Sequence, residues 1–255
     1  MANKYYALSF DSVANFQASL QNALTDKYGD GVEFLFTGKA ASASYWHEFI
    51  FRCPQISDKC ISIGCYDGNV RSIGAFYGDG VESNKMVNPV RFASVEAGSK
   101  SPIAYSMVLG DTFLFIDFSM NDFGGDIIVG KTNGGVSLCC GCGSATGSST
   151  VTNNALKNTA DGSCVKFISY NHTVYGSAHM PYKTKLLIAS NSENTLLTLP
   201  DGTPDTIEGL YMSMYAGTAP VCTTSGLFSR RNTYSNGDGS NAINTTSILA
   251  EFDTE

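Results

Sequence analysis

The chain has 255 residues, of which 15% are charged and 43% hydrophobic, and its formal net charge is −7. A hydrophobic fraction of this size excludes an intrinsically disordered chain, and the length suits one large β domain or two smaller ones. The negative charge argues against binding to nucleic acid or to an acidic membrane surface, because either partner would repel it.

The first predicted element is an amphipathic helix near the N-terminus. In FDSVANFQASLQNALTDKYG, apolar residues recur at spacings of three and four from Val13 to Leu24. Asp11 or Ser12 can cap the start of this helix, and Gly29 can end it. Before it, MANKYYALSFDS has one lysine and an apolar patch that Asp11 cuts short, so we expect no signal peptide and synthesis in the cytoplasm.

Strands dominate the rest of the chain. The segments are short, rich in aromatic or β-branched residues and bounded by turn residues, which is the pattern of β-strands. Gly110-Asp111 separates two of them at the spacing of a tight hairpin. The predicted strands are 32–38, 47–53, 59–65, 103–109, 112–119, 126–131, 136–140, 165–170, 184–190, 194–200, 209–215 and 245–252.

This order of elements predicts a mainly β fold, sandwich-like or built from several antiparallel sheets, with one N-terminal amphipathic helix. A Gly/Ser/Thr-rich stretch at 141–160 predicts a loop or linker between a helix-plus-β domain at 1–140 and a C-terminal β module at 161–255. The alternative is one continuous domain. SNGDGSN at 235–241 predicts a turn or an Ω-type loop.

GGDIIVGKTNGG, residues 124–135, matches the G-x-x-x-x-G-K-[ST] pattern of a phosphate-binding loop. Such a loop must be compact and lead directly into a helix, whose N-terminus helps to bind the phosphate. Here residues 126–129 favour an extended backbone, and Asn-Gly-Gly after Thr132 breaks a helix. We therefore expect a strand, a turn and a strand, with Lys131 near a strand end in solvent or against a partner. A nucleotide-dependent enzyme that uses Lys131 is the alternative.

The eight cysteines are expected to be mostly free core residues if the chain stays in a reducing cytoplasm. Cys139 and Cys142 have the C-x-x-C spacing that suits two ligands of a zinc ion, and Cys60 with Cys65 would make a looser second pair. Redox chemistry by these thiols is a further alternative. We expect structural thiols, no metal and no cofactor.

Three aromatic residues are candidates for an interaction surface. Trp46 is the only tryptophan of the chain, and Tyr211 and Tyr215 lie in the segment GLYMSMY. Rings of this amphipathic kind are frequent in recognition surfaces and would suit a surface glycan or a host receptor. The other interpretation is that Trp46 packs at a sheet edge or a subunit contact.

The sequence presents no recognisable catalytic constellation. The three histidines, His47, His172 and His179, stand in no pattern with a nucleophile, and the combination of Cys164 with His172 has no supporting context. The segment from Gly143 to Gly147 has alanine where a nucleophile elbow has serine. We expect a protein that is not an enzyme.

The chain resembles structural proteins of bacteriophage particles, above all tail and baseplate components. The resemblance lies in the helix FDSVANFQASLQNAL, in short strands such as VEFLFTG, HEFIFRC and FLFIDFS, in Gly/Asn/Ser/Thr-rich connections and in the C-terminal strand TTSILAEF. It is one of overall style and assigns no residue a role. It implies a non-enzymatic subunit of a symmetric homo-oligomer, assembled in the host cytoplasm and located in the virion. Its partners would be copies of itself and other virion structural proteins.

Overall fold

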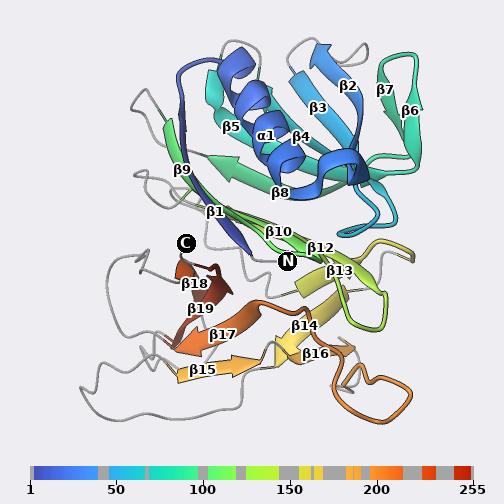
Figure 1. Ribbon diagram of the computed structural model, residues 1–255, viewed down its shortest axis with the longest axis vertical. Helices are drawn as coiled ribbons and strands as arrows, with labels where there is room; N and C mark the ends of the chain where they lie inside the picture. Colours follow the sequence, from blue (N-terminus) through green and yellow to red (C-terminus); the bar gives the residue numbers. More distant parts are fainter. Residues whose placement is uncertain are drawn as a thin grey trace.

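The computed structural model describes most of the chain as strands arranged in antiparallel sheets, with one α-helix (Figure 1). The predicted mainly β, multi-sheet fold with an N-terminal helix is therefore confirmed. The described residues are 3–39, 46–66, 69–96, 103–118, 125–143, 155–161, 164–168, 182–185, 187–190, 196–214, 226–233 and 244–253.

Helix α1 spans Val13–Tyr28, as the apolar spacing predicts. Ser12 caps its start, because the Ser12 side chain accepts a hydrogen bond from the backbone N–H of Asn15. Gly29 ends the helix with a positive φ of 54°, a conformation that glycine adopts without steric cost. A 3-10 turn, η1 (Gly29–Gly31), follows and leads into the first strand of a five-stranded sheet.

Four sheets are described, and each strand pair in them is antiparallel. The five-stranded sheet has the order β2-β3-β4-β5-β8, formed by Glu33–Lys39, Trp46–Arg52, Cys60–Tyr66, Asn69–Gly78 and Val90–Glu96. The eight-stranded sheet has the order β1-β9-β10-β11-β12-β13-β14-β16, formed by Lys4–Phe10, Ile103–Leu109, Phe113–Asp117, Gly125–Lys131, Ser137–Gly143, Ala155–Asn158, Cys164–Ile168 and Leu187–Ser190. The four-stranded sheet has the order β15-β17-β19-β18, formed by Tyr182–Lys185, Leu210–Met214, Asn244–Glu251 and Gly226–Thr233. A hairpin of β6 (Gly80–Glu82) and β7 (Lys85–Val87) makes the two-stranded sheet.

The eight-stranded sheet lies in the middle and is buried on both faces in its central strands. Leu114 and Ile116 of β10 belong to a core shared with α1 and the five-stranded sheet. Phe113 and Phe115, which alternate with them, belong to a second core that includes Leu210 and Ala250 of the four-stranded sheet. Figure 1 shows these layers, with α1 and the five-stranded sheet above and strands β14 to β19 below. Burial on both faces explains why the central strands are continuous apolar runs.

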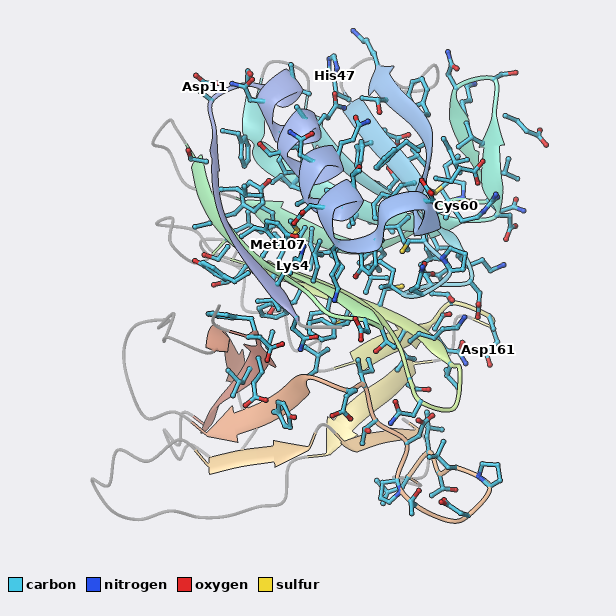
Figure 2. All side chains as sticks on the ribbon, viewed as in Figure 1. Lys4, Asp11, His47, Cys60, Met107 and Asp161 are labelled. Atoms are coloured by element: carbon cyan, nitrogen blue, oxygen red, sulfur yellow. The ribbon has the colours of Figure 1, made fainter. Side chains whose placement is uncertain are left out.

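The first core is the larger of the two. Phe16, Leu20 and Leu24 of α1 are fully buried in it, and the ring of Phe16 lies 4.6 Å from that of Phe10 between their centroids. Met107 of β9 lies in the same layer, between α1 and the central sheet (Figure 2). In the described part of the chain, no helix has the length and apolarity needed to cross a membrane.

Two strand predictions are wrong. Residues 184–190 were expected as one strand, but β15 and β16 divide that segment and belong to different sheets. In the predicted strand 194–200, the described residues 196–200 form no strand and only isolated bridges, at Leu196 and at Thr198, which pairs with Pro204. The backbone turns there, because Gly202 adopts a φ of 81° and donates its N–H to the carbonyl of Leu199.

The predicted boundary segment 141–160 contributes to the central sheet. Residues 141–143 end β12 and residues 155–158 form β13, so strands from both sides of the segment join one sheet. The division into domains stays a prediction. The predicted loop at 235–241 lies outside the described residues.

Candidate functional site

The segment that matches a phosphate-binding loop is a strand, a turn and a strand, as its composition predicts. β11 pairs with β12 in a register that sets Lys131 opposite Ser137. The N–H of Thr132 donates to the carbonyl of Val136, and the N–H of Gly135 donates to the carbonyl of Thr132. No helix follows Thr132, so the dipole on which such a site depends is missing here.

A carboxylate of the protein itself occupies the turn. The hydroxyl of Thr132 donates to Asp205 Oδ2 at 2.6 Å, and the N–H of Gly134 donates to Asp205 Oδ1 at 2.9 Å. The N–H of Thr206 donates to the same oxygen as Gly134 at 3.0 Å. A side chain at Gly134 would stand 2.6 Å from Asp205 Oδ2, so only glycine allows this approach. Asp205 is 3% exposed, so it fixes the turn from within the fold.

Lys131, the lysine of the motif, also has partners within the fold. Lys131 Nζ pairs with Asp58 Oδ1 at 2.5 Å and donates to the carbonyl of Pro54 at 3.2 Å. The hydroxyl of Ser137 donates to the other oxygen of Asp58. The hydrogen bond from Lys131 is the main reason that the pKa of Asp58 lies below its usual value. Lys131 and Thr132, the last two residues of the motif, therefore hold parts of the fold together instead.

The candidate zinc residues do not come together in the described structure. Cys60 lies in a small outer cluster of the five-stranded sheet near the β6–β7 hairpin (Figure 2), whereas Cys65, five positions on, lies in the first core on the opposite face. Cys139 is buried in the first core, and Cys142, whose side chain is not described, pairs with Asp126 in the strand register. Burial raises the pKa of Cys65 to about 12, which disfavours the thiolate that a metal or redox site needs. Within the described residues, no three His, Cys, Asp or Glu side chains are placed to hold a metal ion.

The candidate interaction residues belong to different sheets. Trp46 opens β3 in the five-stranded sheet, whereas Tyr211 is half-buried in β17 of the four-stranded sheet. Tyr215 lies outside the described residues. Of the three candidates, the described structure thus places only Trp46 and Tyr211, and it places them in different sheets.

A residue that the sequence does not single out, Glu48, occupies a distinctive place on the five-stranded sheet. It lies in β3 directly between Gly38 of β2 and Gly64 of β4 in the strand register. Strand alternation puts it on the outer face with Ile50, which belongs to the outer cluster, and away from Phe49 in the first core. Burial raises the pKa of its half-buried carboxyl group. In sequence, Glu48 resembles any polar residue on the solvent face of an amphipathic strand.

The ring of Phe36 borders this position. A side chain added at Gly38 would stand 3.5 Å from Cζ of Phe36, so the ring lies beside the glycine that faces Glu48. Gly38 has a φ of 146°, which other residues rarely adopt. We refer to Phe36, Gly38, Glu48 and Gly64 as the Glu48 surface.

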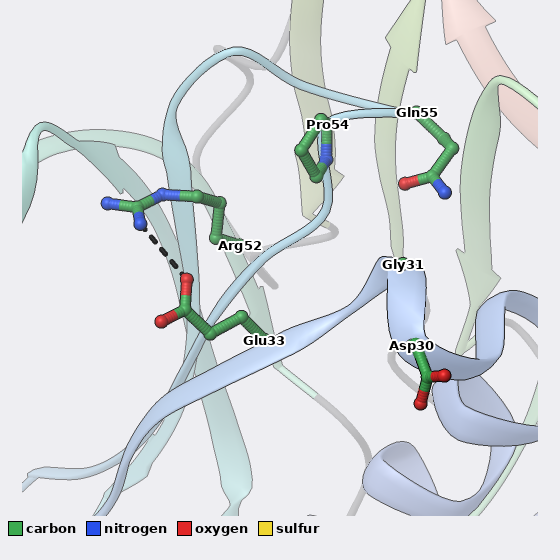
Figure 3. Close-up of a pocket in the computed structure, with 6 residues that line it drawn as sticks. All are labelled: Asp30, Gly31, Glu33, Arg52, Pro54 and Gln55. Carbon is green, nitrogen blue, oxygen red and sulfur yellow. Dashed lines mark hydrogen bonds and ion pairs between the residues drawn. The ribbon is translucent and has the colours of Figure 1, made fainter.

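A hollow of about 490 Å³ lies between η1 and the ends of β2 and β3 (Figure 3). Arg52 and Glu33 pair beside it, with Nη1 and Oε2 separated by 3.0 Å. A side chain at Gly31 would meet Gln55 Nε2 at 2.2 Å, the end of an exposed, flexible side chain that lies against the turn. The guanidinium and one carboxylate satisfy each other, and the carboxylate of Asp30 also lines the hollow.

In comparisons with known proteins, no family model and no curated protein matches the chain.

Proposed function

We propose that this protein is a non-enzymatic structural subunit of a bacteriophage particle, in the tail or baseplate, which acts through contacts with copies of itself and with other virion proteins. The proposal keeps the role that the sequence resemblance implies, with assembly in the host cytoplasm and final location in the virion. A role of this kind needs surfaces that bury apolar groups and strand edges against neighbours.

The observation that supports the proposal best is the edge of the five-stranded sheet. Among the described strands, β2 pairs with β3 on one side only. Phe34, Leu35 and Phe36 are consecutive in it and half-buried, so apolar side chains accompany an open row of backbone donors and acceptors. An edge of this length and apolarity is a site at which another chain can add a strand.

The residues in and around the phosphate-loop pattern support the same proposal. Lys131, Thr132 and Asp205 form ion pairs and hydrogen bonds that join separate segments of the fold. Binding of a nucleotide at residues 125–132 would first have to break these interactions.

Light scattering and cryo-electron microscopy of the purified chain at rising concentration test the proposal. We expect closed symmetric oligomers, because identical subunits that bury a shared edge tend to assemble with point symmetry. Thr37→Lys, at an exposed position of β2, should shift association to about tenfold higher concentration, since edge lysines oppose strand addition. Asn22→Lys on the exposed face of α1 adds the same charge and should leave association unchanged. A chain that stays monomeric at all concentrations and is absent from purified particles would refute the proposal.

A further inference from the structure

Glu48 has a glycine on each side in the strand register. Its register neighbours on both sides, Gly38 and Gly64, have no side chains, and Gly64 is followed by Gly74 in β5. The ring of Phe36 stands beside Gly38. The Glu48 carboxylate, in the second strand of the sheet, is thus bordered by a half-buried aromatic ring and by glycines.

Within the described residues, no hydrogen bond or ion pair reaches the Glu48 carboxylate. By contrast, at least five acidic side chains of the described structure pair with a lysine or an arginine. These pairs are Lys4–Asp26, Lys27–Asp111, Arg52–Glu33, Lys59–Asp79 and Lys131–Asp58.

A second unsatisfied polar group lies on the same face. Ser62 is opposite Ile50 in the register, two positions along β3 from Glu48. Its side chain is fully buried, and its hydroxyl has no hydrogen-bond partner in the described structure. The Ser62 hydroxyl is enclosed by the chain itself, so of these two groups only the half-buried Glu48 carboxylate is within reach of another molecule.

We propose that the Glu48 surface binds an arginine side chain of a neighbouring protein subunit. The guanidinium group would donate two parallel hydrogen bonds to the Glu48 carboxylate and stack on the ring of Phe36. This inference deepens the proposed assembly function and rests on it, because the arginine belongs to another subunit.

Charge and shape favour arginine over the other occupants. The chain carries a formal charge of −7, so a basic partner is complementary to it. A saccharide could donate hydrogen bonds to Glu48 but would leave its charge uncompensated in a half-buried position. Lysine supplies the charge without the planar fork that can serve the carboxylate and the ring together.

Amide NMR titration of the isolated chain with N-acetyl-arginine amide tests the proposal. We expect saturable shifts at Gly38, Glu48 and Gly64, with N-acetyl-lysine amide binding more weakly. Glu48→Gln should weaken binding by about tenfold and Phe36→Leu by about threefold, because the first removes the charged acceptor and the second removes the ring. Glu82→Gln removes the same charge from an exposed position in β6 and should bind as the wild type does.

A measurement on the wild type alone tests the proposal even if the variants do not fold. The Glu48 carboxyl group, followed through a pH titration by the NMR signal of its carboxyl carbon, should ionise at lower pH when N-acetyl-arginine amide is present. Absence of saturable shifts in the wild type, unchanged binding by Glu48→Gln, or saccharides binding at the same amides in place of the arginine probe would each overturn the site. Because the probe needs no assembly, arginine binding by a chain that never oligomerises would refute the virion role alone.

Discussion

At the scale of single residues, Asp205 shows how an acidic side chain can complete a turn that resembles an anion site. Its two oxygens accept from Thr132, Gly134 and Thr206, and the carboxylate is nearly inaccessible to solvent. The turn therefore depends on a residue outside its own hairpin. The donors of this turn thereby stabilise the native chain.

Replacing Asp205 should expose that dependence. We expect Asp205→Ala to lower the free energy of unfolding by about 3 kcal/mol, because several buried donors lose their acceptor together. Urea denaturation followed by circular dichroism measures the change. Asp201→Ala is the control, since Asp201 accepts hydrogen bonds from Thr203 in an exposed turn of the same loop. Equal effects of the two substitutions would contradict this account.

Glu48 gives a prediction about pH. Burial raises the pKa of this carboxyl group in the folded state, so the folded chain binds the proton more tightly than the unfolded chain. The stability that this proton contributes is present below the unfolded-state pKa and is lost as the pH rises through the folded-state pKa. Glu48→Gln should therefore be more stable than the wild type at neutral pH, with a difference that shrinks as the pH falls to about 4.

Thermal or urea unfolding at both pH values checks this expectation. Glu82→Gln serves as the control, because it removes one negative charge from the exposed β6–β7 hairpin and so reports the effect of net charge alone. A Glu48→Gln variant that is less stable than the wild type at neutral pH would show that the carboxylate has a favourable partner.

At the scale of elements, local sequence patterns predict the helices and hairpins whose structure depends on residues that are close in sequence. The helix could be read from its apolar spacing, Ser12 and Gly29, because its hydrogen bonds and caps lie within a few residues. The hairpin of β9 and β10 followed from Gly110-Asp111 between two apolar runs. The segment 184–190 was misread as one strand, because no local signal shows that its two halves join different sheets.

The candidate sites escaped sequence analysis for a related reason. Glu48 becomes distinctive only when the register places Gly38 and Gly64 beside it. Asp205 meets Thr132 across 73 positions of the chain, a distance that no sequence window covers. The phosphate-loop interpretation of Lys131 could be rejected from sequence, because the residues after Thr132 prevent a helix from starting. The ion pair with Asp58 could not be predicted.

At the scale of the whole molecule, the central sheet connects two cores. Phe115 packs in the second core and Ile116 in the first, although they are adjacent in β10. A cavity on either face should therefore weaken the layer on which both cores depend.

We expect Phe115→Ala to lower the free energy of unfolding by about 4 kcal/mol and Ile116→Ala by about 3 kcal/mol. Hydrogen exchange should show lost protection in α1 for both variants, even though Phe115 lies on the face away from that helix. The physical reason is that α1 packs on the same strands that both side chains anchor. Unchanged protection of α1 in Phe115→Ala would mean that the two cores unfold independently.

The hydrogen bonds between Asp205 and the turn also have a consequence for vectorial synthesis. Thr132 leaves the ribosome 73 residues before Asp205 does, so its hydroxyl must be hydrated until the later loop arrives. During that interval the hairpin of β11 and β12 lacks the acceptor that fixes its turn. During synthesis the turn can therefore be completed only after the segment that carries Asp205 has emerged and docked on it.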